Sequence, residues 1–200
     1  YLGGLVPGDD AGEHIDSRRQ TGNILRRGSV PVTEIRAGII VGPGSAAFEV
    51  MRDLTLNLPV MVTPRWVRAT SPPIALHNLL VYLEQVSQAD KAAGKVYDAG
   101  GPEICSYEDM MRAMAAAVGK RAPIILPVPV LTPRLSSYWL GLTTAVPANI
   151  ARALIGGLKH DFIADDAELR ALVPQKLLTV KESIADAIAT ERNGDVAVRW

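Results

Sequence analysis

Short runs of apolar, β-branched residues alternate with longer amphipathic stretches along the first half of the chain. Residues 30–41 form the clearest run, because Val32, Ile35 and Ile39 follow one another closely before the run breaks at Gly42-Pro43-Gly44. Such a run is typical of a strand that is buried on both faces of a parallel sheet. Ser45 then suits the N-cap of a new helix. Because ligands of open α/β sheets bind beyond the carboxyl ends of the strands, residues 42–45 are the first candidate site.

The same periodicities divide the rest of the chain. Strands are expected over residues 1–5, 30–41, 59–63 and 95–99, at an edge over 122–130 because of its prolines, and at 162–163. Helices are expected over 13–27, 45–56, 77–86, 107–118, 135–142, 148–158, 165–172 and 180–192. The alternation predicts an α/β fold with a parallel sheet over residues 1–105. A smaller, mostly helical substrate-side unit is expected over 106–192, and a linker or the start of a further unit over 193–200.

Composition narrows the function classes. The formal net charge is +0 and 48% of the residues are hydrophobic, which argues for a sizeable core and against a nucleic-acid or anionic-membrane surface. The single cysteine, Cys105, excludes an internal disulfide and fits the reducing cytoplasm. Residues 135–151 carry no charge, but they are too polar and too few for the roughly 20 apolar residues of a membrane span.

Two patterns could carry chemistry near the predicted sheet edge. His14 and Arg18 lie four residues apart on one predicted helix and therefore on one face. A histidine beside a fixed positive charge favours the neutral imidazole, which can accept a proton, and the arginine can bind a ribose or phosphate. A solvated surface pair is the alternative. The turn at residues 42–45 offers backbone N–H groups to an anion, although a tight turn without a ligand explains it equally well.

A second group of residues could face a substrate. Arg65 and Trp66 follow a predicted strand, and Arg134 and Tyr138 lie on a predicted helix that starts at a proline. Anion binding and stacking are the functional interpretation, while a solvated loop and core packing are the alternatives. His77 and His160 have no partners at metal-ligand spacing, so no metal site is predicted. The sequence contains no G-x-S-x-G, P-loop, H-E-x-x-H or G-x-G-x-x-G pattern.

Several segments together resemble a known family. In order along the chain they read YLGGL, HIDSR, VPVTEIRAGIIVGPGSAAFE, LPVMVTPRWV, PIAL, YDAGGPE and VPVLTPRLSSYW. From residue 1 to about 158 the chain resembles the carboxyl-terminal two thirds of atypical short-chain dehydrogenases/reductases. Within these, it is most similar to NmrA-like NAD(P)-binding proteins related to nucleotide-diphosphate-sugar epimerases and dehydratases.

The resemblance implies a partial Rossmann-like sheet and an NAD or NADP cofactor. The family's catalytic Tyr-x-x-x-Lys falls on His14 and Arg18, which departs from the family pattern. The cofactor would be contacted by Gly3, Gly4, Ala37, Gly38, Ile40, Gly42 and Ser45. A small-molecule substrate would be contacted by Arg65, Trp66, Arg134 and Tyr138.

Two functions follow from the resemblance and stay open. One is an oxidoreductase or epimerase in an intact parent, with His14 as acid/base. The other is a non-catalytic, NAD(P)-sensing regulatory or structural protein, favoured by the missing Tyr and Lys. The chain is further expected to be a fragment without the Gly-rich dinucleotide loop and inactive alone. Its exposed sheet edge would then pair with a second copy or with a complementing amino-terminal segment.

Overall fold

The computed structural model describes residues 1–7, 13–128 and 160–192. Its elements, in chain order, are β1 (Leu2–Gly4), α1 (Glu13–Leu25), β2 (Glu34–Ala37), β3 (Ile40–Val41), α2 (Ala46–Asn57), β4 (Val60–Pro64), the 3₁₀ turn η1 (Arg65–Arg68), β5 (Thr70–Ser71), β6 (Ile74–Ala75), α3 (Leu76–Ser87), η2 (Asp90–Ala92), β7 (Val96–Ala99), β8 (Cys105–Ser106), α4 (Tyr107–Ala117), β9 (Ile124–Val128), α7 (Ala167–Leu172) and α8 (Val180–Arg192).

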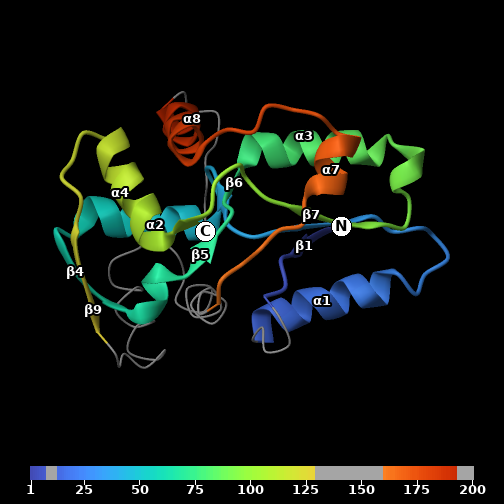
Figure 1. Cartoon of the computed structure of the whole chain (residues 1–200), viewed down its shortest axis with the longest axis horizontal. Coiled ribbons are helices and arrows are strands. Elements are labelled where there is room, and N and C mark those ends of the chain that lie inside the picture. Colours follow the sequence, from blue (N-terminus) through green and yellow to red (C-terminus); the bar gives the residue numbers. More distant parts are fainter. Residues whose placement is uncertain (8–12, 129–159, 193–200) are drawn as a thin grey trace.

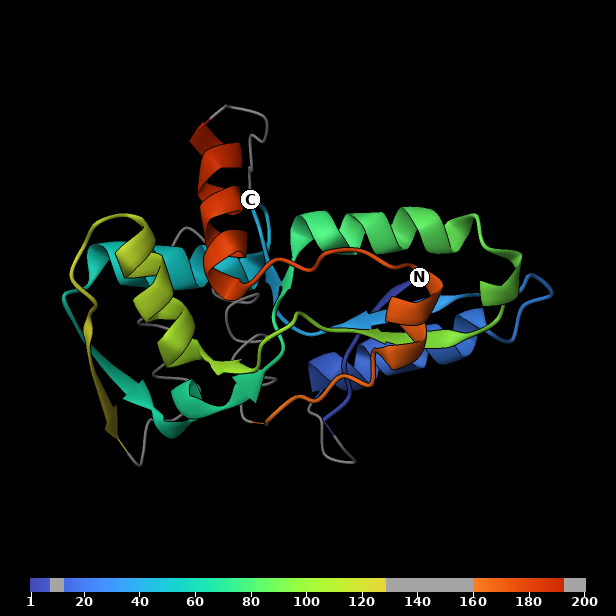
Figure 2. The same ribbon diagram turned by 45° about the horizontal axis from the view of Figure 1, so that its top comes forward.

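A parallel three-stranded sheet in the order β1-β2-β7 confirms the α/β prediction. Figures 1 and 2 show α1 on one face of this sheet and α3, with α7 beside it, on the other. The alternate residues Ile35 and Ala37 of β2, and Tyr97 of β7, are buried in a core that includes Leu79 and Leu169 from the two helices. The period of two along each strand therefore gives the sheet an apolar face toward α3.

The face of the sheet toward α1 is built differently. Glu34, at the start of β2, is 1% exposed and forms ion pairs with Arg26, directly after α1, and with Arg36 of β2. A Cβ on Gly3 would lie 2.5 Å, and one on Gly22 2.6 Å, from the Glu34 carboxylate oxygens. Two glycines thus make room for a buried carboxylate, whose loss of hydration is offset by two guanidinium partners. The strand is covered on both faces as expected, but one of them is ionic.

The strand expected over residues 30–41 is two strands in two sheets. After Ala37 the chain leaves the first sheet at Gly38, and β3 pairs in parallel with β6. A Cβ on Gly38 would lie 3.0 Å from Ser71 Oγ and 3.2 Å from Leu5 Cδ1, so the backbone is crowded where it changes sheet. The single-strand prediction was wrong because the apolar pattern continues across a change of pairing partner.

A second core lies beyond this break. It joins β3, α2, β4, α4 and α8 through fully buried side chains such as Phe48, Met61, Met110 and Ile184. β9 pairs in parallel with β4 alone, which confirms the edge position predicted from its prolines. A capping box formed by Ser106 and Asp109 begins α4. The short pair β5-β8 is antiparallel.

One other prediction failed. Residues 162–163 form no strand: Phe162 makes one backbone hydrogen bond, from its N–H to the Thr70 carbonyl at 2.8 Å. On α1, Ile15 is buried, whereas Ile24 is 63% exposed and Leu25 is also exposed, so the apolar contact of this helix is reduced to one residue. The helices expected over 135–142 and 148–158 lie outside the described residues.

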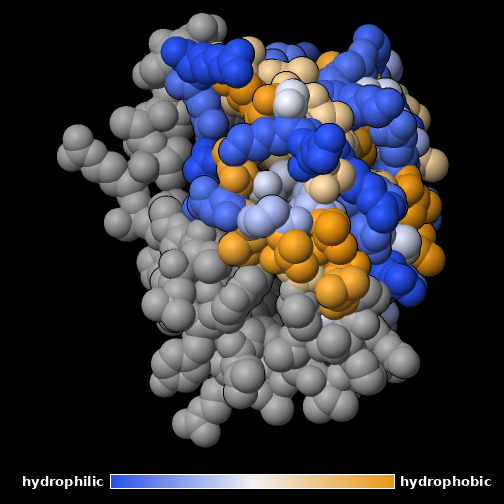
Figure 3. Space-filling model, turned by 90° about the vertical axis from the view of Figure 1, so that its left-hand side faces the viewer, coloured by the Kyte–Doolittle hydropathy of each residue, from blue (hydrophilic) through white to orange (hydrophobic). Residues whose placement is uncertain are grey.

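Apolar surface also remains on the outer side of the β4-β9 pair. Val60, Ile124 and Leu126 are about half exposed there, while Met61 between them in register is buried. Figure 3, which views the side where β4 and β9 lie, shows a hydrophobic area bordered by polar residues. Within the described ranges, no helix has the length and apolar character needed to cross a bilayer.

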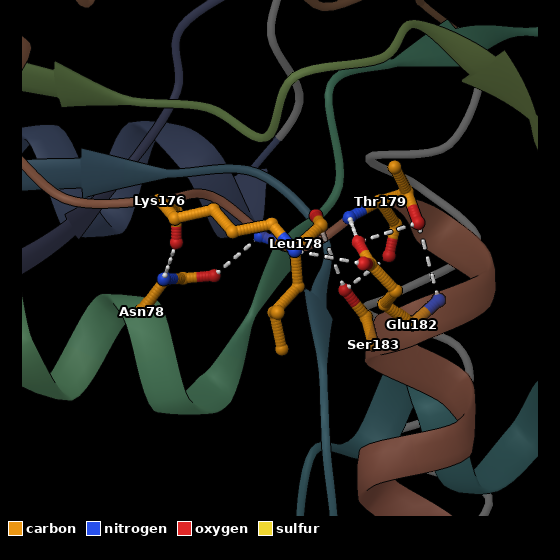
Figure 4. Close-up of polar contacts among 6 residues, drawn as sticks. All are labelled: Asn78, Lys176, Leu178, Thr179, Glu182 and Ser183. Atoms are coloured by element: carbon orange, nitrogen blue, oxygen red, sulfur yellow. Dashed lines mark hydrogen bonds and ion pairs between the residues drawn. The ribbon is translucent and has the colours of Figure 1, made fainter.

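The carboxyl-terminal segment, residues 160–192, crosses several elements and is fixed by polar contacts (Figure 4). Buried Asn78 of α3 donates from Nδ2 to the Lys176 carbonyl at 3.0 Å and accepts the Leu178 N–H at 3.0 Å. Glu103 accepts the Val180 N–H at 2.7 Å, at the start of α8. Glu103 therefore supports the amino terminus of α8.

A capping contact at α8 leads to a pH-dependent prediction. The Thr179 N–H and hydroxyl, together with Lys176, lower the pKa of Glu182 to about 2. Because the folded-state pKa is depressed, this carboxylate stabilises the fold above its unfolded pKa near 4.5, and the contribution disappears as the pH falls toward 2.

We therefore expect the melting temperature of wild type to be higher than that of Glu182→Gln at pH 7. The difference in melting temperature should disappear as the pH falls from 4.5 to 2. Melting curves recorded by circular dichroism across this range measure it. Glu84→Gln, an exposed change on α3, controls for the loss of one surface carboxylate. A difference in melting temperature that is as large at pH 2 as at pH 7 would contradict the stabilising role of the Glu182 carboxylate.

Candidate functional site

The candidate site lies at the carboxyl ends of β1 and β2, where three segments converge. Leu5 directly follows β1, and its N–H donates to the Ala37 carbonyl at 3.1 Å. Its side chain packs on Ile15 of α1 and approaches Gly38, the residue after β2. Ser71 of β5 completes this edge: it is fully buried, and within the described structure its Oγ has no hydrogen-bond partner. Leu5, Gly38, Ser71 and the first turn of α1 are hereafter called the carboxyl edge.

The structure places His14 and Arg18 on α1, four residues apart, as the sequence predicted. His14 lies in the first turn of the helix, directly before buried Ile15, and so at the carboxyl edge. Arg18 is one turn further along; its Nη1 donates to the Leu2 carbonyl at 3.4 Å, and its Cδ lies 3.5 Å from a Cβ built on Gly4. Arg18 thus lies along β1 with an exposed side chain that can still reach a ligand.

The turn at Gly42–Ser45 is already occupied by groups of the chain itself. Gly44 has φ 81° and donates its N–H to Glu49 Oε1 at 3.1 Å, while the Ser45 N–H donates to the Gly42 carbonyl at 3.2 Å. Glu49 is buried and ion-paired with Arg52, which also pairs with Glu191 of α8. An anion binding here would have to displace a carboxylate.

Burial has the largest effect on Glu49. It raises the pKa of the carboxyl, against the opposing effects of the Gly44 hydrogen bond and of Arg52. Glu191 and Asp53 raise the pKa further. The carboxylates around the turn therefore make it unfavourable for phosphate and suited to an uncharged group.

The remaining predicted residues are placed as follows. Gly3 and Gly4 lie on β1, Ala37 ends β2, and Ile40 begins β3. Gly42 packs too closely on Leu76 for a side chain. Arg65 and Trp66 belong to the 3₁₀ turn η1. Arg134 and Tyr138 lie outside the described residues. The roles of all these residues stay predictions.

Sequence reasoning missed three residues that shape this region. Glu34 holds α1 on the sheet, Glu49 fills the turn, and Ser71 leaves a buried hydroxyl at the carboxyl edge. Two of them had a signal in the sequence. Glu34 is a charged residue within an apolar strand pattern, and Glu49 lies in the first turn of the helix after Gly44, where a carboxylate can reach the N–H groups of the turn. Ser71 had no signal, because its position depends on distant pairing.

The described residues offer neither a reactive thiol nor a metal site as an alternative catalytic site. Burial, followed by the charges of Asp109 and Glu103, raises the pKa of the Cys105 thiol to about 12, so the thiolate is not formed near neutral pH. Among the residues that the structure places, no group of three or more His, Cys, Asp or Glu side chains could hold a metal ion.

Comparisons with known proteins identify the fold. No protein-family model and no curated protein matches the chain. Among solved structures, a nucleoside-diphosphate-sugar epimerase from Staphylococcus aureus is 12% identical with a TM-score of 0.69, covering 92% of this chain and 63% of its own. An NADPH-dependent quinone oxidoreductase from Escherichia coli, complexed with NADPH, is 15% identical with a TM-score of 0.69, covering 94% and 64%.

A third structure widens the range of chemistry on this fold. UDP-glucuronic acid 4-epimerase from Bacillus cereus, in complex with UDP-glucuronic acid and NAD, is 13% identical with a TM-score of 0.64, covering 96% of this chain and 60% of its own. The chain thus spans a little under two thirds of the length of these structures. In the residues that the structure describes, the chain has the Rossmann-like fold of these epimerases and of this reductase.

Proposed function

We propose that this protein binds NAD or NADP at the carboxyl edge and acts as an oxidoreductase or epimerase-like enzyme on a small molecule. The observation that carries the proposal is the placement of His14 in the first turn of α1, with Arg18 one turn later on the same face, beside the carboxyl ends of two parallel strands. Ligands of open α/β sheets bind at this edge. The likeness to structures that contain NADPH or NAD supports the cofactor class.

The described residues fit the nicotinamide half of such a cofactor. Arg18 is exposed and can donate to a ribose hydroxyl. Ser71 Oγ is a buried, unpartnered polar atom at the same edge. The turn at Gly42–Ser45, whose N–H groups at Gly44 and Ser45 donate within the chain, suits an uncharged ring better than a pyrophosphate. The cofactor, when bound, supplies or accepts a hydride.

His14 would manage the accompanying proton. In carbonyl reduction a hydride adds to the carbonyl carbon, and the imidazolium of His14 gives its proton to the oxygen, so that an alcohol forms and the imidazole is left neutral. In the reverse direction the neutral imidazole accepts the hydroxyl proton.

The direct test is turnover of NADPH by the full-length protein over a panel of quinones, aldehydes and ketones. We expect His14→Ala to reduce kcat roughly 10²- to 10³-fold, because general acid catalysis contributes about that much. Gln20→Ala, an exposed change on the same helix, should leave kcat unchanged. Equal turnover by wild type and His14→Ala would reject the catalytic role.

One observation favours the alternative, a protein that binds the dinucleotide without chemistry. Arg18 donates to the Leu2 carbonyl on the side of β1 away from β2, which is a structural use of the residue at the catalytic lysine position. In this case calorimetry would show NADPH binding that Arg18→Ala weakens, with no turnover on any carbonyl. Undetectable binding of both NADH and NADPH would reject both functions.

A further inference from the structure

Helix α1 is held on the sheet by one buried apolar side chain and a few polar contacts. Among its side chains that the structure describes, Ile15 is the one buried apolar residue. Arg18 bonds to β1, and Arg26, directly after the helix, is ion-paired with Glu34. The two anchors Ile15 and Arg26 lie near opposite ends of the helix, and Arg18 lies between them. The end that carries His14 therefore depends on what surrounds Ile15.

Ile15 is buried by Leu5 and by Phe162, a residue from the carboxyl-terminal segment. The three form a small core of their own, separate from the two larger ones, with Val6 and Ala164 packed at its margin. Phe162 is 8% exposed, whereas its neighbour Ile163 is 78% exposed. One large aromatic side chain thus covers the amino-terminal anchor of α1.

The backbone around Phe162 is fixed independently of α1. Asp161 Oδ1 accepts the Thr70 N–H at 2.6 Å and the Thr70 hydroxyl at 2.9 Å, and the Phe162 N–H donates to the Thr70 carbonyl at 2.8 Å. Thr70 belongs to β5, next to Ser71 of the carboxyl edge. Phe162 is therefore attached to β5 through its backbone and to α1 through its side chain.

We infer that Phe162 is a positioning residue, which seats the first turn of α1 against Leu5 and so holds His14 at the carboxyl edge. The catalytic part of this inference rests on the proposed function, whereas the seating of α1 does not. Truncating Phe162 removes its large side chain from the small core around Ile15, so the amino-terminal half of α1 should open locally while the larger cores persist.

Hydrogen exchange of the full chain, followed by mass spectrometry, tests the seating without reference to activity. In Phe162→Ala we expect exchange in the first turns of α1 to rise about 10- to 100-fold, with α2 and α4 unchanged. Ile163→Ala, a matched change on the exposed neighbour, should exchange like wild type. Phe162→Leu keeps apolar volume and should recover most of the protection. Phe162→Val, a smaller truncation that should raise the exchange of α1 to a lesser degree, serves as the test variant if the alanine variant does not fold.

Kinetics then separate positioning from general stability. If His14 is catalytic, Phe162→Ala should lower kcat at least tenfold with less than a threefold change in KM for NADPH, and Phe162→Leu should restore it. Unchanged exchange in α1 of Phe162→Ala, or equal effects in Ile163→Ala, would overturn the inference. Faster exchange together with turnover that His14→Ala leaves intact would confirm the seating and reject the proposed function instead.

Discussion

Gly101→Ala is expected to destabilise the protein by about 3 kcal/mol or more, because a methyl group has no space there. A Cβ on Gly101 would overlap Pro73 O, far inside the 3.0 Å below which real Cβ contacts are essentially absent. The clashing atom is a backbone carbonyl oxygen, so no side-chain rotation can move it away. Gly101 itself is held in place, because its N–H donates to the Pro72 carbonyl at 3.3 Å and its carbonyl accepts from Arg170 at 3.1 Å.

Urea unfolding followed by circular dichroism measures this cost, and Gly94→Ala provides the contrast. Gly94 has φ +75° with nothing within 4 Å of a built Cβ, so alanine there costs only the left-handed backbone, about 1 kcal/mol. Gly101 has no positive φ, so its cost is steric alone. Similar urea midpoints for the two variants would contradict the prediction, because they would show that the backbone at Pro72-Pro73 can shift to accommodate the methyl group.

Asn78→Ala should cost about 1 to 3 kcal/mol, the second large effect, because it removes a buried side chain that bonds two partly buried backbone groups. Asn78 is 2% exposed, and its side chain is bonded to the Lys176 carbonyl and to the Leu178 N–H. It also donates to Gln175 Oε1 at 2.8 Å, and Gln175 returns a bond from Nε2 to the Asn78 carbonyl at 3.1 Å. Alanine keeps the backbone carbonyl that Gln175 contacts, but it loses the three hydrogen bonds of the Asn78 side chain.

The control is His77→Ala, an exposed change at the preceding position of α3, for which we expect less than about 0.5 kcal/mol. Because residues 173–179 connect α7 to α8, hydrogen exchange should also rise at the start of α8 in Asn78→Ala. A loss of stability confined to α3, with α8 as protected as in wild type, would contradict the role assigned to Asn78.

Most helices could be predicted from the sequence because their signals are local. α8 occupies residues 180–192 as expected, and α4 begins at residue 107 as expected, where Ser106 and Asp109 form a capping box. The central strand failed for a tertiary reason. Ile35, Ala37, Ile39 and Val41 keep one apolar alternation, yet the chain changes sheets at Gly38. Periodicity does not report the partner of a strand.

The candidate site could be predicted only in part. The spacing of His14 and Arg18 indicated their shared helix face, but nothing local indicated how α1 is held. Burial of Glu34 requires that Gly3 and Gly22, far apart in sequence, both lack a side chain. Two apolar residues at 162–163 resembled a strand, whereas one of them completes a distant core. Contacts between remote segments decide such positions.

The attachment of residues 160–192 has a consequence for biosynthesis. Thr70 bonds to a residue 91 positions later, and Asn78 to one 100 positions later. During translation at about 5–20 residues per second, the earlier segments leave the ribosome several seconds before these partners exist. In that interval Ile15 lacks the cover of Phe162 and the core under α3 lacks Leu169, so the nascent chain exposes apolar surface to chaperones until residues 160–192 have emerged.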